Sequence, residues 1–137
     1  MIPKTIRRFI SLLKRLSQIS DYNVITYSGK LFSLNDLYSS GHWRTRQNIK
    51  NKYKEIFMKV LDDHNVKPVE NFSILIFYNS RHDPDNITGM EKILVDTMRS
   101  TGIIIDDTKK YYKFFGIVPD LQLKKNSLEI YLIDHGN

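Results

Sequence analysis

Residues 81–107 constrain the fold of this chain most, because acidic groups there flank a segment with helical spacing. The apolar run 72–78 comes shortly before them and predicts a strand. Asp83 and Asp85 follow that strand two residues apart, and residues 88–101 have the periodicity of a helix. The segment holds six acids and only three Lys or Arg, in a chain whose formal net charge is +6.

Asp106 and Asp107 follow a second apolar run, residues 103–105, which also predicts a short strand. Carboxylates at strand ends on either side of one helix can converge, and several anions in one place repel unless a cation neutralises them. Carboxylate oxygens suit Mg²⁺ or Mn²⁺, which take further ligands from water and phosphates. The acids therefore fit a metal-assisted phosphodiester site. They also fit ordinary turn and N-cap chemistry, because Asp and Asn favour both positions.

The composition predicts one soluble globular domain, with 137 residues that are 41% hydrophobic and 26% charged. An excess of 21 Lys and Arg over 15 acids, with a pI near 9.5, favours a polyanionic partner. The lack of cysteine excludes disulfides and thiolate metal sites and fits a reducing compartment. No apolar run is long enough to span a bilayer and no Walker-type glycine-rich loop is present, so we expect no membrane partner, no nucleotide hydrolysis and no organic cofactor.

Residues 1–20 carry five Lys or Arg and no acid, and their apolar residues recur at helical spacing. They predict a basic amphipathic helix that precedes the main domain, residues 21–137. We prefer a helix that packs on its own domain or on a second subunit. A membrane-surface helix or a mitochondrial presequence is the alternative.

The rest of the chain predicts a hairpin, a long helix and two further strands. We expect the hairpin over residues 22–32, the helix over 44–64, and strands over 111–118 and 127–133. The polar side of the helix carries six Lys or Arg against one Glu, which indicates either a solvated face or contact with backbone phosphates. The resulting order, α-β-β-α-β-α-β-β, predicts an α+β domain in which two helices pack on a mixed, curved sheet, with the N-terminal helix in addition.

The polar residues of the acidic centre also resemble a known family. They are, in order, Asp83, Asp85, Asn86, Lys92, Asp96, Gly102, Asp106 and Asp107. This order resembles the core of the RusA family of phage-type Holliday-junction resolvases, which reads Asp-x-Asp-Asn, Lys, Asp, Gly and Asp-Asp. The loop that contains Asn35 and His42 is similar to an Asn-containing loop of phage members, so the resemblance covers residues 22–133.

Two features depart from the family pattern. Three extra residues, around 88–90, separate Asp85 from Lys92 relative to the shortest members, and we interpret them as a longer loop. Residues 1–20 are an extension that the short members lack.

The resemblance implies a homodimeric crossover junction endonuclease that depends on Mg²⁺ or Mn²⁺ and cuts four-way DNA symmetrically in recombination and repair. Carried over by position, Asp83, Asp85 and Asp107 become the metal-binding carboxylates, with Asp106 as a secondary candidate, and Lys92 becomes the catalytic cation. It also implies a bacterial cytoplasm and a phage or prophage origin. Without the resemblance, a Lys at this position would simply pair with the acid four residues later on the helix.

Two other functions stay open beside the junction endonuclease. One is a non-catalytic basic DNA-binding module whose acids serve as caps, and the other is a nuclease for other branched DNA. Convergence of Asp83, Asp85 and Asp107 within about 4–6 Å would favour the metal site, whereas their dispersal on unconnected turns would argue against the junction endonuclease. The cations that we expect to contact DNA are Arg44, Arg46, Lys50, Lys54, Arg81, Lys109 and Lys110.

Overall fold

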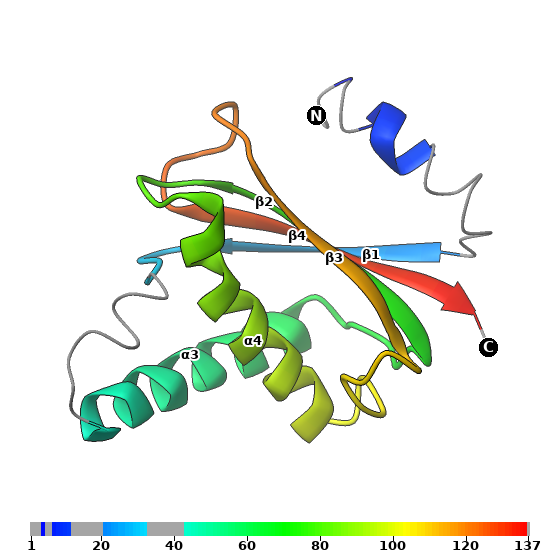
Figure 1. Cartoon of the computed structure of the whole chain (residues 1–137), viewed down its shortest axis with the longest axis horizontal. Helices are drawn as coiled ribbons and strands as arrows, with labels where there is room; N and C mark the ends of the chain where they lie inside the picture. Colours follow the sequence, from blue (N-terminus) through cyan, green and yellow to red (C-terminus); the bar gives the residue numbers. More distant parts are fainter. Residues whose placement is uncertain (1–3, 5–6, 12–20, 33–42, 137) are drawn as a thin grey trace.

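The computed structural model describes residues 4, 7–11, 21–32 and 43–136 of the chain (Figure 1). Its main elements follow one another as β1 (Asp21–Ser28), α3 (Trp43–Asp63), β2 (Asn71–Asn79), α4 (Pro84–Ser100), β3 (Tyr112–Pro119) and β4 (Ser127–Gly136). Residues 7–11 form a further short helical segment.

The four strands form one open, mixed sheet in the spatial order β1-β4-β2-β3 (Figure 1). β4 pairs antiparallel with β1 on one side and with β2 on the other, while β3 runs parallel to β2 at the edge. Seven consecutive residues of β2 are buried, as is typical of a strand covered on both faces. The predicted α+β class, with two helices packed on a mixed, curved sheet, is confirmed.

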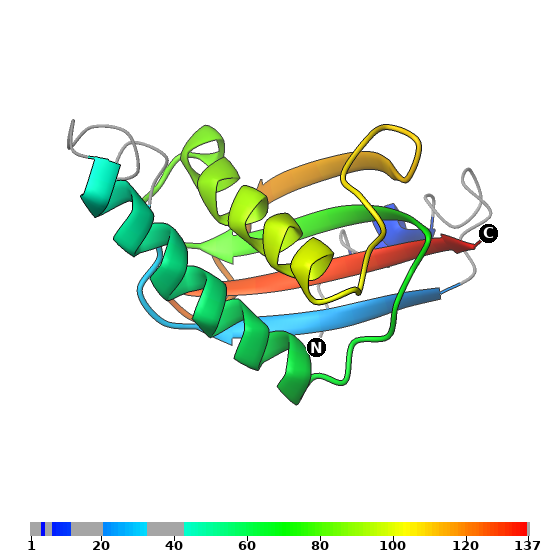
Figure 2. The ribbon, with the colours of Figure 1, turned by 90° about the horizontal axis from the view of Figure 1, so that it is seen from below.

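α3 and α4 lie side by side on one face of the sheet (Figure 2). α3 turns Tyr53, Phe57 and Leu61 toward the sheet, at the i, i+4, i+8 spacing that one helix face requires. α4 buries a wider face, and its apolar residues join those of α3, β2 and β4 in the main core. This packing against α3 and the sheet fixes the position of α4, and with it the position of the residues at its two ends.

A smaller apolar cluster covers the opposite face of the sheet. Leu75, Phe77, Tyr131 and Ile133 form it, and Ile10 of the short N-terminal helix packs on it. Figure 1 shows that helix on the side of the sheet away from α3 and α4. The predicted N-terminal helix is therefore confirmed for residues 7–11, and its Ile10 packs on the domain. The remainder of that helix, and the Asn-containing loop before α3, lie outside the described residues.

The predicted hairpin over residues 22–32 is wrong. β1 is a single strand whose partner is β4, nearly the whole chain away, with Ser28 opposite Ser127. Leu31 and Phe32 turn into the main core instead, and the Phe32 ring lies against Tyr53 with 4.5 Å between the ring centroids. A hairpin would leave these two apolar side chains outside the core, so their burial favours the observed path of the chain.

The predicted start of the second helix, residue 88, is also wrong, because α4 begins at Pro84. Proline is favoured at the first helical position, where its missing N–H has no partner to lose. Asp83 is the N-cap residue, with extended backbone angles. Residues 88–90, which we expected to lengthen the loop, therefore lie inside the helix.

The apolar run 103–105 does not form the short strand that we expected. Gly102 has a φ of +81°, and the chain reverses there; a glycine in this left-handed conformation is a common way for a helix to end. The Ile103 N–H donates to the Met98 carbonyl at 2.9 Å, and the Gly102 N–H donates to the Arg99 carbonyl at 3.3 Å. This closure buries the first two isoleucines of the run and leads the acids that follow back toward α4.

Candidate functional site

The first pair of predicted ligands, Asp83 and Asp85, lies at the N-terminus of α4. Both side chains are exposed, and Asp83 makes no side-chain cap hydrogen bond. Asp85 lies in the first helical turn, where the helix dipole favours a negative charge. The charges of both carboxylates act on Tyr78, a buried residue at the end of β2: burial raises the pKa of Tyr78, and the charges of the two acids raise it further.

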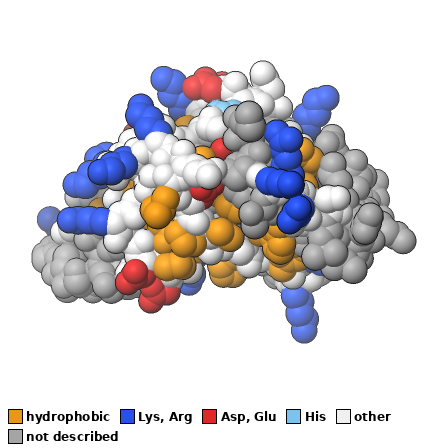
Figure 3. Space-filling model, turned by 90° about the horizontal axis from the view of Figure 1, so that it is seen from above, with side chains coloured by type: hydrophobic (Ala, Val, Ile, Leu, Met, Phe, Trp, Pro, Cys, Tyr) orange, Lys and Arg blue, Asp and Glu red, His pale blue; other side chains and the backbone are white. Residues whose placement is uncertain are grey.

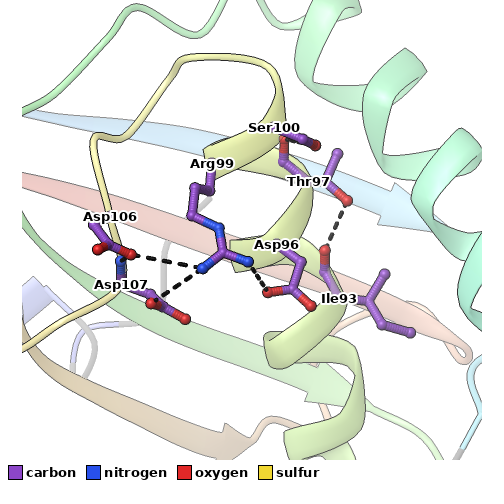
Figure 4. Close-up of polar contacts among 7 residues, drawn as sticks. All are labelled: Ile93, Asp96, Thr97, Arg99, Ser100, Asp106 and Asp107. Carbon is purple, nitrogen blue, oxygen red and sulfur yellow. Dashed lines mark hydrogen bonds and ion pairs between the residues drawn. The ribbon is translucent and has the colours of Figure 1, made fainter.

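The second pair, Asp106 and Asp107, lies near the other end of α4 and is bound by an arginine (Figure 4). The guanidinium of Arg99 lies 3.6 Å from the Asp106 carboxylate, 3.5 Å from that of Asp107 and 3.5 Å from that of Asp96. The Asp107 N–H donates to Asp106 Oδ1 at 2.8 Å. This hydrogen bond, and then Arg99, lower the pKa of the Asp106 carboxyl.

The structure brings the predicted ligands together in two pairs and not in one cluster. Asp85 lies in the first turn of α4 and Arg99 in the last, which separates them by about 20 Å along the helix at 1.5 Å per residue. Within the described part of the chain, no three His, Asp or Glu side chains are placed to hold a metal ion. Asp107 therefore lies apart from Asp83 and Asp85 in this structure.

The donor chemistry of the first pair fits a divalent metal. Mg²⁺ is usually held by one or two carboxylates, with waters and substrate phosphates as its other ligands. Asp83 and Asp85 supply two such carboxylates, and neither forms an ion pair among the described residues. Asp106 and Asp107 fit less well, because Arg99 already balances their charge.

Lys92 and Asp107 line a small cavity of about 360 Å³ between α4 and the start of β3. Its buried wall is Glu91, whose side chain accepts a hydrogen bond of 2.6 Å from the Tyr112 hydroxyl. Burial raises the pKa of Glu91, although the hydrogen bond from Tyr112 opposes that shift. Asp96, which would be the partner of Lys92 if that lysine only formed an ion pair on the helix, binds Arg99.

Three residues of these sites were not predicted from the sequence: Glu91, Arg99 and Tyr112. For Glu91 a signal was present, because it is four residues after Ile87 and falls on the apolar stripe of the helix. For Arg99 the only local signal was its position three residues after Asp96. Tyr112 gave no signal, because its contact with Glu91 depends on how β3 packs beneath α4.

The expected DNA-contacting cations lie on separate parts of the surface. Those of α3 lie between the start and the middle of that helix: Arg44 and Lys50 are exposed, whereas Arg46 and Lys54 are half-buried. The segment between α4 and β3, which carries Lys109 and Lys110, lies at the opposite end of the sheet from the β2–α4 loop of Arg81 (Figure 1). None of these cations pairs with an acid among the described residues.

No protein-family model and no curated protein matches this chain. None of the described helices is long and apolar enough to cross a membrane. What the chain does must therefore be inferred from its own residues and their arrangement.

Proposed function

We propose that this protein is a metal-dependent endonuclease that cuts four-way DNA junctions. The observation that carries the proposal is the pair of exposed carboxylates, Asp83 and Asp85, at the helix terminus directly after a buried strand. The resemblance of residues 83–107 to the RusA core supports the same reaction. The net charge of +6 suits a DNA substrate, because phosphates are neutralised by Lys and Arg.

In this proposal Asp83 and Asp85 hold Mg²⁺ or Mn²⁺. The bound ion would lower the pKa of a coordinated water and offset the charge that develops on the phosphate. Lys92 lies two helical turns after Asp85 on the exposed side of α4, where it would attract the negatively charged backbone. Asp106 and Asp107 stay candidates for the metal only if Arg99 releases them.

Symmetric cutting of a junction requires two active sites related by a two-fold axis. One chain supplies one pair of exposed acids at Asp83 and Asp85, so the proposed reaction needs a homodimer. A nuclease that acts on other branched DNA would share the metal chemistry, and only a comparison of substrates separates the two activities.

A non-catalytic DNA-binding module is the second candidate. Its specific support is the division of the acids into two pairs, one of which is bound by Arg99. In that case Asp83 serves as the N-cap of α4, and Asp85 stabilises the first turn through the helix dipole.

The test is cleavage of a synthetic four-way junction, with and without Mg²⁺ or Mn²⁺, by the wild type and by Asp85→Asn. We expect paired, metal-dependent nicks and a loss of cleavage beyond the roughly 10–100-fold that outer-sphere partners of metals typically contribute. Binding should persist or tighten, because the substitution removes negative charge near the DNA. Asp62→Asn, at the exposed end of α3, is the matched control and should cut normally.

Tight binding without cleavage under any metal would refute the nuclease and favour the binding module. Parallel loss of binding and cleavage in Asp85→Asn, with a lowered unfolding midpoint, would show that Asp85 supports the fold instead.

A further inference from the structure

The end of the sheet that carries the β2–α4 loop also holds a cavity of about 930 Å³ that is open to solvent. Three segments form it: the residues after β1, the loop after β2, and the turn before β4. We call it the loop groove. Its polar side chains include those of Lys30, Asn79, Arg81, His82, Lys124 and Lys125.

The loop groove is strongly basic. Lys30, Arg81, Lys124 and Lys125 are all exposed, and no Asp or Glu is among the described residues that line the groove. In the space-filling view, one group of Lys and Arg side chains lies toward the left, the end of the sheet at which this loop lies in Figure 1, and other Lys and Arg side chains lie toward the right (Figure 3). A concave surface lined by one sign of charge concentrates the field and attracts a polyanion.

Backbone hydrogen bonds hold the three segments in fixed positions. The Gly29 N–H donates to the Asn126 carbonyl at 2.9 Å, and the Asn126 N–H donates to the Asn79 carbonyl at 2.7 Å. The Asn79 side-chain amide donates to the Leu123 carbonyl at 2.7 Å. Asn126 has a φ of +58°, which asparagine tolerates better than most residues and which lets the turn close. The groove is therefore formed before any ligand binds.

The loop groove leads directly to the first acid pair. Its His82 precedes Asp83 in the chain, and the Tyr78 hydroxyl donates to the His82 carbonyl at 2.8 Å. The charges of Asp83 and Asp85 raise the pKa of that same hydroxyl. Cations and carboxylates thus adjoin at one end of the sheet, as they must if a bound phosphate is to meet a metal.

We propose that the loop groove binds the sugar–phosphate backbone of a DNA strand and leads it to Asp83 and Asp85. The step from groove to cutting rests on the proposed function, whereas the binding of a polyanion does not. Of the expected DNA contacts only Arg81 lies in this groove, so Lys30, Lys124 and Lys125 are assigned here from the structure. The cations of α3 and of residues 109–110 lie outside it.

The test measures binding of a labelled four-way junction by fluorescence anisotropy in EDTA, over a range of KCl concentrations. We expect the double variant Lys124→Gln/Lys125→Gln to weaken binding about tenfold or more at low salt. We expect it to reduce the slope of log K against log salt by roughly 1.4–1.8, if each lysine neutralises one phosphate. Lys59→Gln/Lys67→Gln, which removes the same charge beside a different cavity, is the matched control and should change little.

Two further experiments test whether the charges of the loop groove, and not a folding defect or a small-anion site, explain the loss of DNA binding. Lys124→Arg/Lys125→Arg should restore binding, and unchanged unfolding midpoints would show that the variants fold. Inorganic phosphate should compete no better than sulfate at equal ionic strength. Displacement of DNA by phosphate at low concentration would overturn the proposal, because it would identify a small-anion site.

Equal weakening in the groove variant and in the control would also overturn the proposal, because net charge would then explain the loss. A junction that stays uncut but binds through the loop groove would refute the proposed function alone. Metal-dependent cutting by a protein whose binding ignores Lys124 and Lys125 would refute the groove alone.

Discussion

Replacing Tyr112 by Phe tests the buried contact beneath Lys92 and Asp107. Glu91 is only 6% exposed, and its carboxylate accepts a 2.6 Å hydrogen bond from the Tyr112 hydroxyl. The substitution removes that hydroxyl but keeps the ring, which stacks on Phe72 with 4.7 Å between centroids. Any loss of stability therefore reports the hydrogen bond and not the packing.

The expected loss is about 2 kcal/mol where Glu91 is ionised, since hydrogen bonds to charged groups contribute roughly 1.5–3 kcal/mol. With an unfolding entropy of about 2.1 cal/mol/K per residue, this lowers the Tm of a chain of this length by about 7 °C. Near pH 4, where the raised pKa keeps Glu91 protonated, we expect a loss of only about 1 kcal/mol, typical of a neutral hydrogen bond.

The direction of this pH dependence follows from proton linkage. Burial raises the pKa of Glu91, so its contribution to stability is complete below its unfolded pKa and is lost as the pH rises through the folded value. The bond from Tyr112 lowers that folded pKa, and its removal raises it again. The difference in the free energy of unfolding between the Tyr112→Phe variant and the wild type must therefore increase with pH.

Urea unfolding at pH 4 and pH 7 measures both losses. Tyr111→Phe is the control, because its hydroxyl makes no hydrogen bond within the described part of the chain, and it should stay within about 0.5 kcal/mol of the wild type. An equal loss at both pH values, or no loss at pH 7, would refute a charged hydrogen bond at Glu91.

Two other substitutions test the same region. Glu91→Gln keeps an oxygen that can accept the hydrogen bond from the Tyr112 hydroxyl, but it removes the buried charge. Urea unfolding should therefore find the variant more stable than the wild type at pH 7, and this gain in stability should disappear toward pH 4. A gain that does not depend on pH would contradict this reasoning. Gly102→Ala places a side chain at a φ of +81°, where no atom would meet its Cβ, so thermal unfolding should show a loss of about 1–2 kcal/mol from backbone strain alone. An unchanged midpoint would show that the turn tolerates alanine.

The sequence predicts most elements well because their patterns are local. The bounds expected for α3, β2, β3 and β4 lie within one to three residues of those observed, since helical and alternating apolar spacing are readable within a single segment. The partner of β1 was not readable in that way. The turn signal at Ser28–Lys30 suggested a hairpin, whereas the strand pairs with β4 across the sequence.

In the candidate site, too, some features can be predicted from local sequence and others depend on how distant segments pack. The acids themselves are visible in the sequence, but their grouping depends on the length of α4 and on the reversal at Gly102. Arg99 binds Asp106 and Asp107 only because that reversal returns these two acids to the helix. Spacing alone therefore predicted one cluster of acids where packing produces two pairs.

The start of α4 at Pro84 also changes how the three extra residues before Lys92 must be understood. Since residues 88–90 lie within the helix, they add most of one turn instead of lengthening a loop. A lysine seven residues after Asp85 points within about 60° of one placed four residues after it, and lies about 4.5 Å further along the axis. Lys92 therefore stays on the exposed side with Asp85, so the insertion moves the cation along the helix without turning it into the core.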